Sequence, residues 1–337
     1  MKENRMIMKE NRMILLVSTS TDASFNLALE ELLTSFFCEE VIMLWRNRNA
    51  VIVGRNQNTA AEIDSGFVRE NDIQVIRRMT GGGAVYHDLG NINYTIVANE
   101  RQLDPEAFAR NAAPVLKVLQ KMGLPAEFSG RNDIQIDGKK ISGSAKTVLN
   151  DRTLFHGTLL FSANLSILGK VLTPDPEKIQ AKGIKSVRSR VGNIRDFLPE
   201  MELESFFEEL KTQLINLTGA VETAIPEALT AAAEALAESK YRTWLWNYGT
   251  AISYSYSKKR RFPFGGCQVS FNVVENRIAD FALTGDFFGS EPAVQAAEYF
   301  NGVSLDPEKL VAAIKKFPVE KIIHGATSED LQSLFDL

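Results

Sequence analysis

The chain has 337 residues, of which 45% are hydrophobic and 24% charged, a composition typical of a globular protein with a substantial core. A formal net charge of −4 excludes an overall basic field of the kind that attracts nucleic acid. No apolar run approaches the ~18 residues of a membrane span, and the distant Cys38 and Cys267 match no metal or redox spacing. We therefore expect a cytoplasmic protein without membrane or nucleic-acid partners. Residues 1–7 recur as 8–14 and are interpreted as a duplicated start outside the fold.

The first hundred residues predict several strands and one helix. A short apolar run at 13–17 is typical of a strand, and apolar residues spaced by three and four from Ser24 to Phe36 predict a helix. We expect 41–45 and 50–54 to form a hairpin whose turn lies at 47–49. Further strands are predicted at 73–79, 84–86 and 92–98.

The middle of the chain predicts a helix followed by an antiparallel meander. Residues 104–106, Asp-Pro-Glu, are typical of a helix start, and Gly123 is typical of a helix end. The dipeptide Asp137-Gly138 is a strong signal for a hairpin turn. The strands of this meander are predicted at 133–137, 140–148 and 153–163.

The remaining elements set the fold class. Strands and helices mix without a regular βαβ alternation, which favours an α+β fold with mixed, largely antiparallel sheets flanked by helices. Around 248–255 the sequence changes from long helical segments to short segments rich in β-forming residues. This change predicts a boundary between a catalytic domain, 8–250, and a small α+β C-terminal domain, 256–337. Helices are predicted at 201–217, 226–245, 292–300, 307–317 and 328–334, and strands at 267–274 and 277–283.

Three consecutive glycines, Gly81 to Gly83, follow a predicted strand and allow a ligand to approach the backbone. Neither G-x-x-x-x-G-K-[ST] nor G-x-G-x-x-G is present, so anion binding here would depend on loop amides and side chains rather than a helix dipole. Arg77 and Arg78 precede the glycines and point to opposite faces of a strand, so we expect only one to reach a ligand. His87 and Asp88 add polar groups nearby.

A second group of polar residues surrounds Lys140. The sequence KISGSA, 140–145, places this lysine on a strand beside small side chains, which leave room for a ligand. Asp133 lies upstream as a carboxylate for Mg²⁺, and His156 lies on the next strand. The three histidines form no H-x-x-x-H pair, so zinc is not expected.

With RRMTGGGAVYHD (77–88), GRND (130–133) and KISGSA in this order, the chain resembles the lipoate–protein ligases of the A type, which are relatives of biotin–protein ligases. The resemblance covers most of 8–249, and the tail is similar to the small C-terminal domain of that family more loosely. Further matching segments are SFNLALEE (24–31), LWRN (44–47), VIVGRNQN (51–58), LGN (89–91), HGTLL (156–160) and AKGIKSVRSRV (181–191).

The resemblance implies a two-step reaction with ATP and Mg²⁺. Lipoate and Mg·ATP give lipoyl-adenylate and pyrophosphate, and a lysine of an acceptor protein then attacks the mixed anhydride to form an amide. The implied acceptors are the glycine-cleavage H-protein and the lipoyl domains of 2-oxoacid dehydrogenase acyltransferase subunits.

The resemblance also implies roles for individual residues. Lys140 is the implied catalytic residue, and Asp133 the implied metal ligand. Lys182, Lys185 and Arg188 are implied to belong to a mobile basic loop that closes over the adenylate. ATP or the adenylate is implied to contact Arg78, Gly83, Ala84, Val85, Tyr86, Asn91, Asp133 and Lys140, and lipoate to contact Asn26, Leu27, Trp45, Gly81, Gly82, His87, Lys140 and His156.

Three other functions compete with this one. An ATP-independent octanoyl or lipoyl transferase uses a cysteine as acyl carrier, but Cys38 is expected in a helix core and Cys267 lies in the tail. A biotin–protein ligase is expected to carry a GRGR-type glycine motif, which is absent. A non-catalytic binder of lipoate or nucleotide is disfavoured by the joint presence of Arg78, Asp133 and Lys140.

Overall fold

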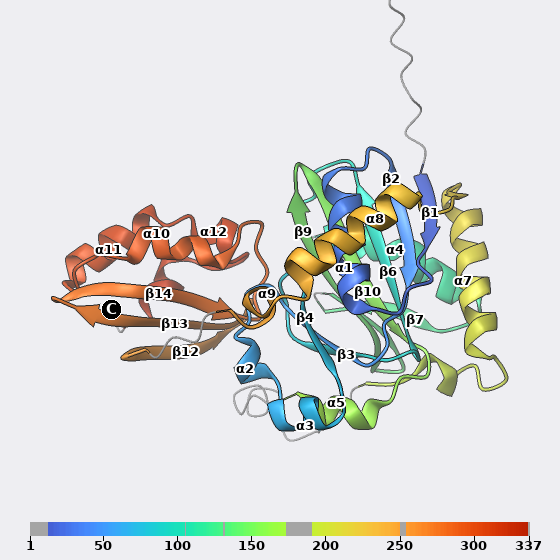
Figure 1. The fold of residues 1–337 in the computed structure, drawn as a ribbon, viewed down its shortest axis with the longest axis horizontal. Coiled ribbons are helices and arrows are strands. Elements are labelled where there is room, and N and C mark those ends of the chain that lie inside the picture. The colour runs from blue at the N-terminus through green and yellow to red at the C-terminus, as the bar shows by residue number, and fades with distance from the viewer. Residues whose placement is uncertain (1–12, 105, 131, 173–190, 250–253, 336–337) are drawn as a thin grey trace, which may run out of the picture.

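The structure, a computed structural model, describes residues 13–104, 106–130, 132–172, 191–249 and 254–335 (Figure 1). An eight-stranded mixed sheet forms the centre of the larger part, with the strand order β11-β1-β2-β6-β10-β9-β8-β7. Among the described strands of this sheet, only the pairs that β1 makes with β2 and β11 are parallel. Its strands are β1 (Met13–Val17), β2 (Glu40–Trp45), β6 (Asn91–Ala98), β7 (Ala126–Ser129), β8 (Asp133–Ile136), β9 (Lys139–Leu149), β10 (Arg152–Leu160) and β11 (Val221–Glu222).

Helices cover both faces of this sheet because its strands place apolar side chains alternately on the two sides. On one face, α4 (Ala107–Lys121) and α7 (Leu203–Thr218) share a core with the strands. On the other face, α1 (Ala23–Ser35) and α8 (Glu227–Leu236) do the same. Helix α1 begins at Asp22, whose side chain accepts a hydrogen bond from the amide of Ser24.

A second, three-stranded sheet carries the glycine segment. It consists of β3 (Ala50–Val53), β4 (Gln74–Arg77) and β5 (Val85–His87), in the order β4-β3-β5. Strand β3 runs parallel to β4 and antiparallel to β5. Three short helices lie near this sheet: α2 (Thr59–Glu62), α3 (Ser65–Glu70) and α5 (Leu165–Val171). The 3-10 helix η2 (Ile194–Asp196) packs instead on the core of the large sheet.

The C-terminal part has its own sheet and its own hydrophobic core. Its helices pack on one side of its sheet, and the whole C-terminal part lies beside the larger part (Figure 1). Its elements are β12 (Tyr256–Phe262), β13 (Gly265–Val274), β14 (Arg277–Gly285), η4 (Ala293–Gln295), α10 (Ala296–Phe300), α11 (Pro307–Lys316), α12 (Val319–Ile322) and α13 (Ser328–Gln332). The predicted α+β class, with mixed sheets and a small C-terminal α+β domain, is confirmed.

Two predictions about elements were wrong. Strands β2 and β3 do not form a hairpin, because β2 pairs with β1 and β6 whereas β3 belongs to the second sheet. Both strands are buried almost throughout, and a continuous apolar run does not specify its partner strand. The single helix predicted at 226–245 is divided into α8, a π-helical turn (η3, Ala237–Tyr241) and α9 (Trp244–Tyr248).

The meander of β8, β9 and β10 agrees with the prediction. The turn between β8 and β9 contains Asp137 and Gly138, whose φ angles of 50° and 73° are those of a tight hairpin turn. Antiparallel pairing then places β9 against β10 and β10 against β6.

Among the described helices, none is long and apolar enough to span a membrane.

Candidate active site

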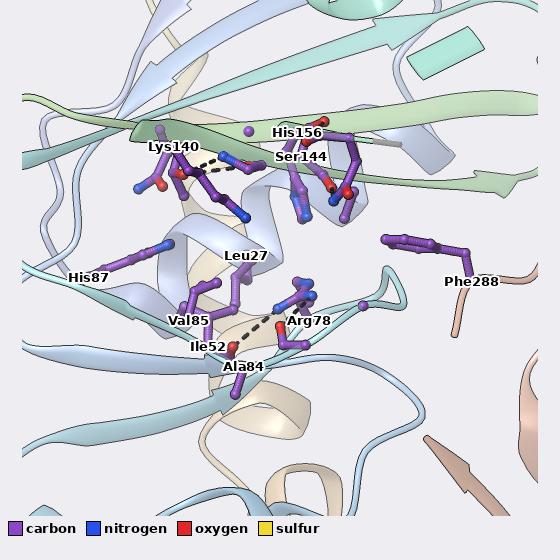
Figure 2. A pocket seen from close by; sticks show the side chains of 18 of the residues that line it. Leu27, Ile52, Arg78, Ala84, Val85, His87, Lys140, Ser144, His156 and Phe288 are labelled. Carbon is purple, nitrogen blue, oxygen red and sulfur yellow. Dashed lines mark hydrogen bonds between the residues drawn. The ribbon is translucent and has the colours of Figure 1, made fainter. Parts of the chain in front are cut away.

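A cavity of about 170 Å³ lies between the glycine segment on one side and strands β9 and β10 on the other (Figure 2). Helix α1 and strand β2 contribute to its wall. Ten residues predicted for the site line this cavity: Leu27, Trp45, Arg78, Gly82, Gly83, Ala84, Val85, His87, Lys140 and His156. Nine further residues, to which no individual contact was assigned, line it as well: Ile52, Asn93, Asn132, Gly143, Ser144, Ala145, Gly157, Thr158 and Phe288.

The glycine segment is held close to the preceding loop. A Cβ atom on Gly54 would lie 1.9 Å from the carbonyl oxygen of Gly82, so only glycine fits at position 54 without a shift of the backbone. Gly82 has a φ of 91°, a conformation that side-chain-bearing residues rarely adopt. A Cβ on Gly83, by contrast, would meet nothing within 4 Å, which leaves open space on the cavity side of the loop.

Arg78 organises this segment from a buried position. Its guanidinium donates to the carbonyl oxygens of Ile52, Gly81 and Gly83 at 3.1, 2.7 and 2.9 Å, and to the hydroxyl of Thr80 at 2.8 Å. Burial lowers the pKa of Arg78 to about 10, so the group remains cationic at neutral pH. The arginine therefore fixes the loop and brings a positive charge to the cavity wall.

Arg77 points away from the cavity, as the alternation of side chains along a strand predicts. Its guanidinium donates to the carbonyl oxygens of Trp246 and Asn247 and to the hydroxyl of Thr59. It also donates to three carbonyl oxygens of the loop after β3, those of Gly54, Arg55 and Gln57, at 3.0, 3.0 and 2.7 Å. Only one of the two arginines thus lines the cavity, and the other ties the second sheet to α9.

Lys140 faces the glycine segment from the opposite wall (Figure 2). Its ammonium lies 2.8 Å from a carboxylate oxygen of Asp133 on the neighbouring strand β8. A Cβ on Gly143 would come within 2.8 Å of the Lys140 ammonium, so the small residues of this strand make room for the lysine side chain. The ion pair with this carboxylate positions the lysine ammonium.

A buried polar network lies beneath the cavity. Glu30, on α1, is 1% exposed and accepts hydrogen bonds from His156 at 2.8 Å and from the hydroxyl of Thr95 at 2.6 Å. The other ring nitrogen of His156 pairs with Thr80 at 2.9 Å. Sequence reasoning missed Glu30, although its place four residues after Asn26 on a buried helix face was a usable signal. The carboxylate orients His156 and offsets the charge of Arg78.

The C-terminal part closes one end of the cavity with Phe288 (Figure 2). The ring of Phe288 lies 5.4 Å from that of Phe108 on α4, and the carbonyl of Phe287 accepts a hydrogen bond from the amide of Gly82 at 3.4 Å. The amide of Gly285 donates to the carbonyl of Asn56 at 2.8 Å. No sequence signal linked Phe288 to the site, because it lies about two hundred residues from the glycines along the chain, although its ring packs into the core of the large sheet.

Several predicted residues lie outside the cavity wall. Tyr86 is on the opposite face of β5, where its hydroxyl donates to Asn49. Asn91 is buried and donates to Asn93, which does line the cavity. Asn26 and Asp133 act behind His87 and Lys140, respectively. Gly81 packs against the backbone of Phe287. Lys182, Lys185 and Arg188 lie outside the described residues.

Neither cysteine lines the cavity. Cys38 is exposed beyond the end of α1, so its predicted place in a helix core was wrong; the helix ends at Ser35, before the cysteine is reached. Cys267 is buried in the core of the C-terminal part, and burial raises the pKa of its thiol well above the ordinary value. The cavity therefore offers no thiol to carry an acyl group.

The described residues contain no cluster of three or more histidine, cysteine, aspartate or glutamate side chains suited to a metal ion. Asp133 is a single carboxylate next to Lys140. Mg²⁺ that arrives with nucleotide phosphates usually takes one or two carboxylates from the protein and fills its other positions with phosphate oxygens and water. The donor set present fits such an ion and does not fit a resident metal.

The fold and the cavity define a class of protein: an α+β protein in which a glycine-rich loop, held by a buried arginine, faces a lysine across a cavity lined by apolar and polar side chains. Residues 22–215 match the family described as lipoyl protein ligase A/B catalytic domain, and residues 251–335 match that described as bacterial lipoate protein ligase C-terminus. The chain belongs to the lipoate–protein ligase family. It is a lipoate–protein ligase.

Individual relatives are similar in sequence to this chain over most of its length. Lipoate–protein ligase 1 of Staphylococcus aureus is 36% identical over 88% of this chain and 92% of its own length. The lipoate–protein ligase LplJ of Bacillus subtilis is 33% identical over 93% of this chain and 96% of its own.

Solved structures extend the comparison to ligand complexes. P. falciparum LipL1 in complex with lipoate has a TM-score of 0.78 at 26% identity and covers 96% of this chain and 98% of its own. A lipoate–protein ligase A bound with ATP has a TM-score of 0.61 at 28% identity, covering 72% and 99%. A bipartite ligase of Thermoplasma acidophilum, described with its E2 lipoyl domain, has a TM-score of 0.63 at 29% identity, covering 73% and 99%.

Proposed function

We propose that the cavity between the glycine segment and strand β9 is where lipoate is adenylated and then transferred to an acceptor lysine. The observation that carries this proposal is the position of Lys140, which faces Arg78 and the glycine segment across one enclosed space. Leu27, Trp45 and Val85 supply the apolar wall for the acyl chain.

In the first step, a carboxylate oxygen of lipoate attacks the α-phosphorus of ATP, and the P–O bond to pyrophosphate breaks. Two anions must meet, so positive charge near the reacting atoms lowers the barrier. A unit charge pair 4 Å apart is worth about 4 kcal/mol at an effective dielectric constant of 20. We assign this role to Lys140, which leaves Asp133 for the phosphate, and to Arg78, which approaches from the opposite wall.

Mg²⁺ belongs to this proposal through Asp133. Asp133 would hold the ion, which would supply positive charge to the phosphates of the nucleotide. Asp133 is the described carboxylate beside Lys140, and its move from the ammonium to the ion would free the lysine for the ligand.

The acceptors that we propose are the glycine-cleavage H-protein and the lipoyl domains of 2-oxoacid dehydrogenase acyltransferase subunits. The E2 lipoyl domain named with the Thermoplasma ligase supports the second class. A hydrophobic core in the C-terminal part, distinct from the three clusters of the larger part, supports a division into a catalytic domain, 8–250, and an accessory domain, 256–337. Two unpaired cysteines support a place in the reducing cytoplasm.

The acceptor proposal predicts that both classes of acceptor are modified. Purified protein with Mg·ATP and lipoate is incubated with an apo H-protein or an apo E2 lipoyl domain, and the acceptors are examined by intact mass spectrometry. We expect each acceptor to gain one lipoyl group. An acceptor whose target lysine is replaced by arginine is the matched control and stays unmodified. If neither acceptor gains mass while lipoyl-adenylate accumulates, the proposed partners are wrong.

A further inference from the structure

His87 has an unusual environment for a histidine in an enzyme cavity. Its side chain is 4% exposed and lines the cavity, and its Nε2 atom has no hydrogen-bond partner among the described residues. The imidazole points into the cavity on the side that also holds Lys140, across from the end that Phe288 closes (Figure 2). A buried polar atom without a partner is costly, so its presence beside a ligand cavity indicates that the ligand supplies the partner.

A chain of hydrogen bonds determines which nitrogen of His87 carries the proton. The side-chain amide nitrogen of Asn26 donates to the backbone carbonyl oxygens of Ser20 and Arg46, which can only accept. The same nitrogen lies 3.0 Å from the side-chain oxygen of Asn47, so that oxygen is an acceptor. The orientation of the Asn26 amide is thereby set by the backbone.

The orientation of Asn47 follows. With its oxygen directed at Asn26, its amide nitrogen faces Nδ1 of His87 at 3.2 Å and donates to it. Nδ1 is therefore the unprotonated nitrogen, and the neutral ring carries its hydrogen on Nε2. Burial, together with the nearby Arg78 and His156, lowers the pKa of His87 to about 3, so the ring is neutral at physiological pH.

We propose that His87 is a catalytic residue that donates its fixed Nε2–H to the acyl oxygen of the substrate during transfer to the acceptor lysine. Asn47 and Asn26 are positioning residues that hold the imidazole in the donor tautomer. This inference rests on the assignment of the cavity as the site of acyl transfer and deepens it.

The chemistry favours the acyl oxygen as the partner. When the acceptor amine attacks, a C–N bond forms and the carbonyl oxygen gains negative charge. The intermediate collapses as the C–O bond to the phosphate breaks, AMP leaves with that electron pair, and one amine proton is lost to water. His87 keeps its proton throughout. A preorganised neutral donor stabilises the oxyanion more than the carbonyl, which is the condition for catalysis.

The test separates transfer from activation. Preformed octanoyl-AMP or lipoyl-AMP is mixed with excess wild-type or variant protein and an acceptor, and single-turnover amide formation is followed. His87→Leu is expected to slow transfer about 10- to 100-fold with both acyl groups, and His87→Gln, which retains an N–H donor, to recover part of the loss. A loss confined to lipoyl-AMP would overturn the proposal, since it would assign the N–H to the dithiolane ring.

Two further measurements test the proposal without the His87 variants, and so do not depend on whether those variants fold. In ¹⁵N-histidine spectra of the wild type, His87 is expected as the Nε2–H tautomer from pH 5 to 8; a protonated Nδ1 would overturn the proposal. Asn47→Asp presents a hydrogen-bond acceptor to Nδ1 of His87. In that variant the neutral ring therefore carries its proton on Nδ1 and has none on Nε2. The transfer rate of the variant relative to wild type is then expected to fall as pH rises. A flat ratio contradicts the positioning role of Asn47. If wild-type protein transfers neither acyl group, the assigned function itself fails.

Discussion

Replacement of Lys140 by alanine is expected to lower the rate of adenylate formation by about 10²–10³. The ammonium faces the glycine segment across the cavity from the β9 wall and lies 2.8 Å from a carboxylate oxygen of Asp133. Its loss removes positive charge from the place where negative charge moves from the α-phosphate to pyrophosphate. The measurement is lipoate-dependent pyrophosphate release under saturating ATP and lipoate.

Lys139 provides the matched control for this prediction. It precedes Lys140 on the same strand and is exposed, and Lys139→Ala removes the same number of charges and methylene groups. We expect that variant to retain near-wild-type activity. Equal turnover in both alanine variants would remove Lys140 from the catalytic machinery and leave Arg78 as the main cation.

Replacement of Arg77 by methionine is expected to lower the free energy of unfolding by about 3–5 kcal/mol. The guanidinium donates to five backbone carbonyl oxygens, among them those of Gly54, Gln57 and Asn247. Methionine fills much of the volume but leaves these buried acceptors without a donor. Urea unfolding followed by tryptophan fluorescence measures the loss.

Two comparisons sharpen the Arg77 prediction. Arg77→Lys keeps the charge, but three ammonium hydrogens cannot reproduce the planar fork, so we expect it to remain substantially destabilised. Arg69→Met, at an exposed position on α3, changes stability by about 0.5 kcal/mol or less. A loss below 1 kcal/mol in Arg77→Met would show that the arginine does not tie the second sheet to α9.

Local signals were enough to predict many of the elements. The turn at Asp137-Gly138 and the periodicity of α1 depend on residues that are close in the chain, and both appear where they were expected. Strand pairing is different, because it is decided by contacts between distant segments. The buried runs of β2 and β3 carry no alternation that distinguishes a hairpin from membership of two sheets, and the hairpin prediction failed for this reason.

The candidate site shows the same difference between features that local sequence predicts and features that depend on distant segments. The two segments with unusual composition, the glycines and KISGSA, form opposite walls of one cavity. Residues that act through others were harder to place: Asn26 was expected to touch lipoate, but it lies behind Asn47 and orients that side chain toward His87. Phe288 reaches the cavity only because the C-terminal part packs beside the glycine segment, and no local pattern records that contact.

The central claim is that the cavity activates lipoate with ATP before any acceptor is present. The most direct test mixes the protein with lipoate and Mg·ATP in the absence of an acceptor, and follows pyrophosphate together with enzyme-bound lipoyl-AMP by rapid quench. We predict a burst of pyrophosphate that approaches one equivalent of protein and an equal amount of bound lipoyl-AMP. An absence of both, together with acyl transfer from an octanoylated carrier protein without ATP, would contradict it.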